Sequence, residues 1–194
     1  MIHKRRNVCR YETYGGFCIV PVQQEEYSRW YIVQALFKLM NEYSYEKINV
    51  TDIVAKAGVG RATFYRYFKN KEDVIIYYFE HHKKEFVFSQ HLYPRCREDY
   101  IKIVTRLLEV FRQQIEPFRL IRRAHLEYIY LDYLNRNFIE SFEEEDRAEK
   151  TFSPYLYAGM LFNVSMKWLD DDCSEPVEEL AALIVNSIYF EKQA

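Results

Sequence analysis

Glycine and proline are scarce in this chain, with five of each among 194 residues. Proteins built from many short strands need these residues at their turns. No succession of alternating apolar and polar segments is present either, so a sheet architecture is excluded. Apolar residues instead recur at helical spacing along most of the sequence. We therefore predict an all-α protein with about nine helices in total.

Cysteine is also sparse, and the four cysteines are scattered. They are Cys9, Cys18, Cys96 and Cys173. No Cys-x-x-Cys pair or Cys/His cluster is present, so we expect no metal site and no cofactor. A membrane-spanning helix needs about 18 consecutive apolar residues, and no apolar run approaches that length. The apolar run 17–20 is too short for a signal peptide. These absences favour a reduced, cytoplasmic protein without a membrane partner.

The chain lacks the residue combinations that carry catalysis. We find no nucleophile beside a base and no phosphate-binding loop. We also find no pair of carboxylates that helical spacing would bring together for catalysis. The run Asp170-Asp171-Asp172 suggests a metal at first sight, but consecutive carboxylates do not converge on one ion. We therefore do not expect an enzyme.

Charge is present in both signs but unevenly distributed. The formal net charge is only −2. Residues 1–85 nevertheless carry 14 Lys and Arg against 10 Asp and Glu, whereas residues 86–194 carry 13 against 19. A basic N-terminal part suits a polyanionic partner there.

The most informative segment is residues 45–74. Asn49 is a good helix N-cap, and Asp52 follows three residues later, where its carboxylate can accept hydrogen bonds from the free N–H groups of the first turn. An apolar face of Ile53, Val54 and Ala57 follows, and Gly58 suits the left-handed residue that ends a helix. A second short helix is predicted from Arg61 to Phe68. Two short helices joined by a glycine-containing turn are typical of a helix-turn-helix.

The second of these helices has the composition of a recognition helix. Phe64 and Phe68, at i and i+4, are expected to anchor it to the core, which leaves its Arg, Thr and Tyr residues on other faces. Asn70 can cap a further helix, and Lys71 at the start of that helix suits a phosphate. The segment therefore predicts double-stranded DNA as the partner.

These motifs closely resemble the DNA-binding domain of the TetR family of bacterial transcription regulators. The matching segments are Ala57-Gly58-Val59, Thr63-Phe64-Tyr65-Arg66-Tyr67-Phe68 and Lys71-Glu72-Asp73-Val74, within residues 26–75. Two positions depart from the family pattern. Asn49 replaces a common Thr and keeps the cap, whereas Gly60 replaces a common Ser and leaves only its backbone N–H for a phosphate.

The resemblance implies a role for each exposed position of the motif. Arg61 would contact base edges, most readily guanine, and Ala62 would let the helix approach closely. Thr63, Tyr65 and Lys71 would hold phosphates. Two alternatives stay open: Tyr67 contacts a phosphate or packs, and Arg66 contacts a phosphate or is merely solvated. The predicted DNA-binding set is Asn49, Gly60, Arg61, Ala62, Thr63, Tyr65, Arg66, Tyr67 and Lys71.

The chain is predicted to have three parts. Residues 1–24 form an N-terminal tail or a basic arm, residues 25–72 a three-helix DNA-binding domain, and residues 73–194 a helical-bundle domain for effector binding and dimerisation. Beyond the motif we expect helices over about 71–88, 97–115, 118–142 with a break near 135–137, 153–168 with Ser153-Pro154 as its start, and from Pro176 onward.

The last two expected helices suit dimerisation, because members of the family pair through their final helices. Their apolar stripes would pack across a two-fold axis or against the protomer's own core. The predicted dimerisation residues are Ala158, Gly159, Leu161, Val177, Leu180, Ala181, Ile184, Val185 and Ile188.

An effector site is expected in the middle helices, as in the usual family member. Each candidate residue is more simply explained as a surface residue or a satisfied core group than as an effector contact. The candidates are Arg119, Arg122, His125, Tyr128 and Tyr157. The C-terminal half is also similar to a subgroup from low-GC Gram-positive bacteria, in which the trigger is not always a small molecule.

Two functional hypotheses follow. The first is a homodimeric, ligand-responsive regulator, most simply a repressor, that binds a palindromic operator. The alternative is a DNA-bound adaptor or coactivator whose second domain binds a protein partner.

Overall fold

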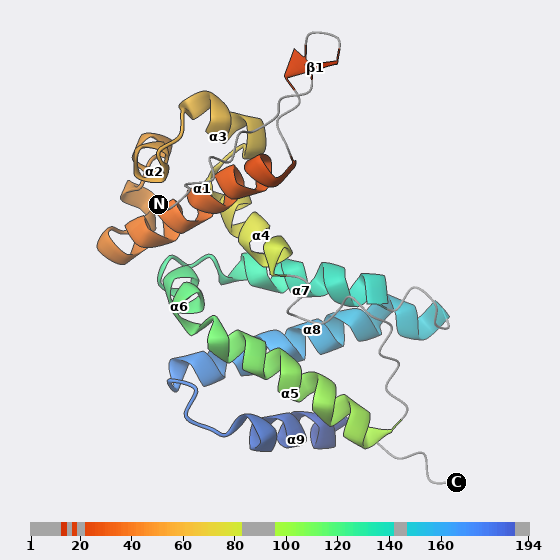
Figure 1. Ribbon diagram of the computed structural model, residues 1–194. Helices are drawn as coiled ribbons and strands as arrows, with labels where there is room; N and C mark the ends of the chain where they lie inside the picture. Colours follow the sequence, from red (N-terminus) through yellow and green to blue (C-terminus); the bar gives the residue numbers. More distant parts are fainter. Residues whose placement is uncertain (1–12, 15–16, 19–21, 83–95, 142–146, 189–194) are drawn as a thin grey trace, which may run out of the picture.

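The computed structural model describes residues 13–14, 17–18, 22–82, 96–141 and 147–188. Within these ranges the chain forms nine α-helices, which confirms the all-α prediction (Figure 1). The helices are α1 (Val22–Glu42), α2 (Val50–Ala57), α3 (Arg61–Tyr67), α4 (Lys71–His81), α5 (Arg97–Gln113), α6 (Ile115–Arg123), α7 (Glu127–Ser141), α8 (Arg147–Asp170) and α9 (Val177–Ile188), with a short 3-10 helix η1 (Tyr45–Lys47) after α1.

A small hairpin that the sequence did not predict precedes α1. The strands β1 (Thr13–Tyr14) and β2 (Phe17–Cys18) pair antiparallel, with Thr13 opposite Cys18. Most of the segment 1–24, predicted as a tail or an arm, lies outside the described residues, as does the acidic run 143–146.

The helix-turn-helix is built by local signals. The side chain of Asn49 accepts a hydrogen bond from the Asp52 N–H at 3.1 Å, and the Asp52 carboxylate accepts one from the Asn49 N–H at 2.9 Å. This reciprocal capping box fixes the first turn of α2. Gly58 has φ +69° and ends the helix in the left-handed region, where a side chain is strained. The next helix, α3, therefore begins abruptly at a fixed angle to α2.

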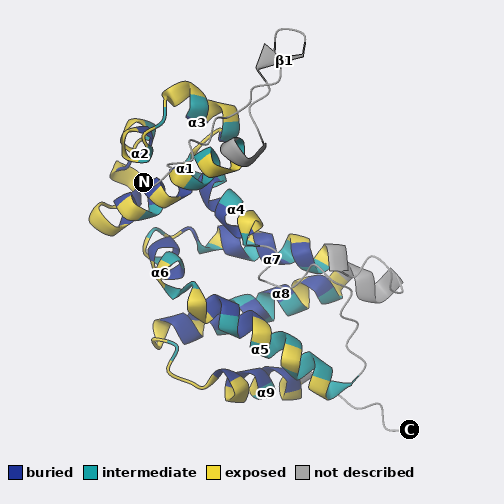
Figure 2. Ribbon diagram, viewed as in Figure 1, coloured by how far each residue is buried: buried dark blue, intermediate teal, exposed yellow. Residues whose placement is uncertain are grey.

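The helix α4 joins the two domains. Its Asn70 cap accepts a hydrogen bond from the Asp73 N–H at 2.8 Å, and its inner face buries Val74, Ile75 and Phe79 completely. Figure 1 shows α4 passing from the α1–α3 group into the group formed by α5–α9. One continuous cluster of buried residues runs through both groups, and the buried faces turn inward in Figure 2. The domains thus share a core through α4.

The C-terminal domain is a bundle in which α7 packs along α8 and α5 along α9. Its centre is filled by aromatic rings from several helices. The ring centroids of Phe111 and Phe118 are 4.2 Å apart, those of Phe118 and Tyr130 4.7 Å, and those of Phe79 and Tyr133 5.4 Å. All five residues are at most 1% exposed. Offset and edge-to-face ring contacts of this kind stabilise a tightly packed interior.

Two helix boundaries differ from the prediction. The break expected near 135–137 lies instead at His125, which has φ 56°, and α7 continues through 135–137. The N–H of Leu126 donates to the Ile121 carbonyl at 3.1 Å, and the N–H of His125 to the Arg122 carbonyl at 3.1 Å. This pattern closes the end of α6 without a glycine.

The second difference concerns Ser153-Pro154, which was predicted to start a helix. The helix α8 already begins at Arg147, and Pro154 lies inside it. A proline within a helix removes one N–H donor, but neighbouring tertiary packing can outweigh that cost. Pro154 is buried, consistent with such packing.

Among the described residues, no helix combines the length and the apolar character that crossing a membrane would require.

Candidate nucleic-acid interface

The outer surface of α3 presents most of the predicted contact residues. Phe64 and Phe68 are buried, whereas Arg61, Ala62, Tyr65 and Arg66 are exposed, and Thr63 and Tyr67 are half-buried. Tyr65 keeps 59% of its surface exposed although it is aromatic. The two phenylalanines therefore anchor the helix as expected. The remaining faces are available to a partner.

The side chain of Arg61 is oriented by the preceding helix. Its Nη2 donates a hydrogen bond to the hydroxyl of Thr51 on α2. Both side chains are exposed, so the guanidinium stays accessible while one of its donors is held. The other donors of this planar group remain available for the two-pronged contact with guanine that the family resemblance implies.

Tyr67 is surrounded by positive charge. Arg66 Nη2 donates to the Tyr67 hydroxyl at 2.8 Å, and the Cζ atom of Arg29 lies 4.9 Å from the ring centroid. Arg29 comes from α1 and also lies 5.7 Å from the ring centroid of Tyr77 on α4. Burial raises the pKa of the Tyr77 phenol, and the nearby Arg29 opposes that rise.

Lys71 holds an internal position at the start of α4. Its Nζ donates to the carbonyl oxygens of Tyr45 at 2.8 Å and Ile48 at 2.7 Å, and lies 4.0 Å from the Tyr45 ring centroid. Burial raises the pKa of the Tyr45 phenol far above its ordinary range, and the Glu72 carboxylate adds to the rise. The Lys71 ammonium thus ties α4 to the segment that precedes α2.

Within the described residues, the cations on and just after α3 lack the ion pairs that Arg119 and Arg122 of α6 form. Among the described residues, Arg61, Arg66 and Lys69 form no ion pair. In the C-terminal domain, by contrast, Arg119 pairs with Asp172 at 2.9 Å and Arg122 with Asp170 at 3.1 Å. The exposed guanidinium groups of Arg61 and Arg66 on α3 are therefore available to a polyanion.

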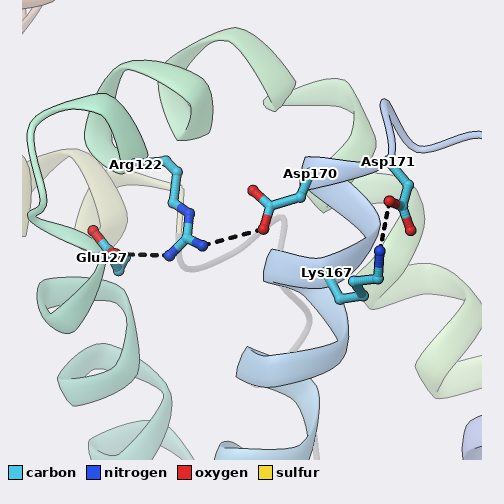
Figure 3. Close-up of polar contacts among 5 residues, drawn as sticks. All are labelled: Arg122, Glu127, Lys167, Asp170 and Asp171. Carbon is cyan, nitrogen blue, oxygen red and sulfur yellow. Dashed lines mark hydrogen bonds and ion pairs between the residues drawn. The ribbon is translucent and has the colours of Figure 1, made fainter.

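The predicted effector residues are dispersed. Figure 3 shows Arg122 between Glu127 and Asp170, with Lys167 on Asp171. The Asp170 hydrogen bond raises the pKa of Arg122, and the Asp171 hydrogen bond raises that of Lys167. The remaining candidates take separate positions: Arg119 is exposed on α6 and bound to Glu116 and Asp172, His125 is exposed in the turn after α6, Tyr128 is 50% exposed on α7, and Tyr157 stacks on Phe138.

The predicted dimerisation residues mostly face the protomer's own core. The buried members are Ala158, Leu161, Val177, Leu180, Ala181, Ile184 and Val185. Gly159 is half-buried, and the side chain of Ile188 lies outside the described residues. The exposed apolar side chains of α8 and α9 are instead Phe152 and Leu156, each at 71%, Leu183 at 63% and Tyr155 at 53%.

Polar contacts among the described residues join the DNA-binding domain and α4 to the bundle. The Tyr78 hydroxyl on α4 donates to Gln114 Oε1 at 2.7 Å, where α5 meets α6. Arg123 of α6 donates to the Met40 carbonyl near the end of α1, and Arg136 of α7 pairs with Glu80 at 3.8 Å. A half-open pocket of about 290 Å³ lies beside the Arg123 contact, between the end of α1 and α6.

Two residues of this interface escaped the sequence analysis. Arg29 and Thr51 lie outside the recognition helix, and only the fold brings them to Tyr67 and Arg61. A weak signal was present for Arg29, an isolated cation among the three aromatic residues Tyr27, Trp30 and Tyr31. Thr51 carried no signal, since threonine is common in the first turn of a helix.

Part of the chain is similar to known regulatory proteins. Residues 32–78 match the family model described as "Bacterial regulatory proteins, tetR family". The chain is 31% identical over 86 residues to the dhaKLM operon transcriptional activator DhaS of Lactococcus lactis, covering 43% of this chain and 46% of that protein. It is 38% identical over 56 residues to a fatty acid metabolism regulator protein of Bacillus subtilis, covering 29% of each. The matches therefore span less than half the length of these curated relatives.

A solved structure extends the likeness to most of the chain. The crystal structure of Lin0861 from Listeria innocua superposes with a TM-score of 0.74 and 19% sequence identity. The superposition covers 88% of this chain and 94% of that one. At this identity it shows a shared fold for both domains.

Proposed function

Because this chain belongs to the TetR family of bacterial regulatory proteins, we propose that it is a sequence-specific transcriptional regulator that binds a palindromic operator as a homodimer. The observation that carries the proposal is the uncompensated positive charge on the exposed faces of α3, within a capped helix-turn-helix. Such a face matches the major groove in shape and charge. We place this activity in the cytoplasm.

The contact set of the proposed interface divides by role. Arg61 specifies bases, with Ala62 and the backbone N–H of Gly60 close to the DNA. Thr63, Tyr65, Arg66 and Tyr67 contact phosphates. Asn49 and Lys71 contribute by fixing the first turn of α2 and the start of α4, since their side chains are engaged within the protein.

We further propose that the protein is a ligand-responsive repressor. An effector in the C-terminal domain would shift the population of α4 orientations and change the spacing of the two recognition helices. The ion pairs of Arg119 and Arg122 to the end of α8 support such a role. Effector binding near the candidate set Arg119, Arg122, His125, Tyr128 and Tyr157 would act on these contacts.

A second candidate function is that of an activator or adaptor with a protein partner. The name of the Lactococcus lactis relative describes an activator. The exposed apolar side chains Phe152, Leu156 and Leu183 offer a surface for a protein. Transcription from a reporter that carries the operator separates the two functions: a repressor lowers expression and an activator raises it.

The DNA-binding proposal is tested by in vitro selection from a random duplex library with the full-length protein, followed by footprinting in increasing salt. A palindromic sequence with half-sites about one helical turn or somewhat more apart is the expected outcome. Absence of any enriched sequence, with only weak binding that salt abolishes, would contradict sequence-specific regulation.

A further inference from the structure

Two guanidinium groups from different helices meet at one tyrosine. The Cζ atoms of Arg66 on α3 and Arg29 on α1 lie 4.7 Å and 4.9 Å from the ring centroid of Tyr67. We propose that Arg29, Tyr67 and Arg66 form a binding site for one DNA backbone phosphate, with Arg29 as a DNA contact contributed by α1. This inference rests on the proposed DNA-binding function and assigns it a further residue.

The local charge favours an anion at this site. Within the described residues neither guanidinium forms an ion pair, and the Nε atom of Arg29 is buried without a hydrogen-bond partner there. Glu26, one turn earlier on α1, lies 3.9 Å from His81 Nδ1. Two like charges held near one ring repel each other, and a phosphate bound beside them would relieve that repulsion.

Contacts within the protein hold the side chains of the site in place before any DNA is bound. Arg66 donates to the Tyr67 hydroxyl at 2.8 Å, and Arg29 is half-buried against the rings of Tyr67 and Tyr77. Guanidinium planes stack on aromatic faces and offer paired donors that match phosphate oxygens. A site with fixed side chains loses less conformational entropy on binding.

The proposed phosphate site lies on the flank of α3 opposite to Arg61, the residue proposed to contact a base. Arg61 and Tyr65, at i and i+4, share one flank of the helix, and Thr63 and Tyr67 share the other. A helix in the major groove has a phosphate backbone on each side. Since the Lys71 ammonium is bound to the Tyr45 and Ile48 carbonyls, Arg29 and Arg66 supply the charge on the Tyr67 flank.

The first test is the salt dependence of operator binding by full-length Arg29→Gln and Arg66→Gln, with Lys38→Gln as the matched control because Lys38 is exposed elsewhere on α1. The homodimer carries each substitution twice and would lose one phosphate contact in each half-site, so each Arg variant should lower the slope of log K against log salt by about 1.8, and affinity should fall about 12-fold less between 50 and 200 mM salt. Base preference and the Lys38→Gln slope should stay as in the wild type.

Wild-type slopes in both folded Arg variants would overturn the assignment. Circular dichroism melting shows whether each variant is folded, and Arg66→Gln carries the test if Arg29→Gln does not fold, because Arg66 is exposed.

A second test locates the phosphate. Operator duplexes with single neutral methylphosphonate substitutions are titrated against wild type and Arg29→Gln. One substitution should weaken the wild type and leave the variant unaffected, which is the non-additivity expected of a direct contact. Additive losses at every phosphate would reject the site while leaving the regulator intact. Failure of the wild type to select any duplex would reject the proposed function itself.

Discussion

At the scale of single residues, the protein uses chemically similar cations for different purposes. Arg61 is exposed and held by one hydrogen bond to Thr51, whereas Lys71 is half-buried and bound to two carbonyl oxygens. Sequence position alone assigned both to DNA. The local partners instead separate the base-contacting role proposed for Arg61 from a structural role of Lys71.

Replacement of Arg61 tests the base contact. Arg61→Ala should relax the preference at one base pair of each half-site and weaken specific binding by about 1–3 kcal/mol, because a two-pronged contact to guanine is lost. Binding to operators with each base substituted in turn measures the effect. Thr51→Val, which removes only the orienting hydroxyl, should produce a smaller loss at the same base pair; an unchanged base preference in Arg61→Ala would disprove the assigned role.

Replacement of Lys71 tests the structural role. Lys71→Met should lower the free energy of unfolding by about 1–3 kcal/mol, since charge-assisted hydrogen bonds to two carbonyls are removed from a half-buried site. Urea denaturation followed by circular dichroism gives the value. Lys69→Met serves as the control because Lys69 is exposed, and equal stability of the two variants would show that the Lys71 contacts are not stabilising.

At the scale of elements, short-range signals predicted the DNA-binding domain well. The capping box of Asn49 and Asp52, the left-handed Gly58 and the anchors Phe64 and Phe68 lie as expected, because each depends on residues within one or two turns. Boundaries that depend on tertiary packing were missed. Pro154 is buried inside α8, and His125 takes the left-handed conformation usually left to glycine.

The partners of the candidate site were also beyond sequence reasoning. Arg29 and Tyr67 are 38 positions apart in the sequence (67 − 29), and only the packing of α1 on α3 brings them together. In the same way, periodicity marked the α9 stripe as apolar without showing whether it faces a second protomer or α5.

Removal of the α2 cap tests a short-range signal. Asn49→Ala should lower the free energy of unfolding by about 0.5–2 kcal/mol, because the Asp52 N–H in the first turn of α2 loses its side-chain acceptor, while the bond from the Asn49 backbone N–H to the Asp52 carboxylate can remain. Thermal melting monitors the loss. Asn49→Asp retains an acceptor and should recover most of the stability; an Asn49→Ala protein as stable as the wild type would mean that the cap is dispensable.

At the scale of the whole molecule, the proposed dimer depends on which apolar residues remain exposed after folding. Leu183 and Ile184 are neighbours on α9, yet Leu183 is 63% exposed and Ile184 only 4%. Substitutions at these two neighbouring positions therefore test association and folding separately.

Because Leu183 is an exposed apolar side chain of α9, we place it in the interface of the proposed homodimer. Leu183→Glu should then give folded monomers with weakened operator binding, because the substitution introduces a charge there. Ile184→Glu should instead unfold the bundle, since a carboxylate is forced into the core. Light scattering coupled to size-exclusion chromatography gives the mass, and circular dichroism reports folding. A folded Leu183→Glu dimer would place the interface elsewhere.

The shared core around α4 has a consequence for the exchange of domains between relatives. A chimaera joined at residue 72 would separate Tyr78 from Phe37 of α1, although their ring centroids are 4.9 Å apart. A chimaera joined beyond α4 would instead separate Phe79 from Tyr133 of α7, at 5.4 Å. Productive recombination, in the laboratory or in evolution, should therefore require parents whose residues match α4 on both of its sides.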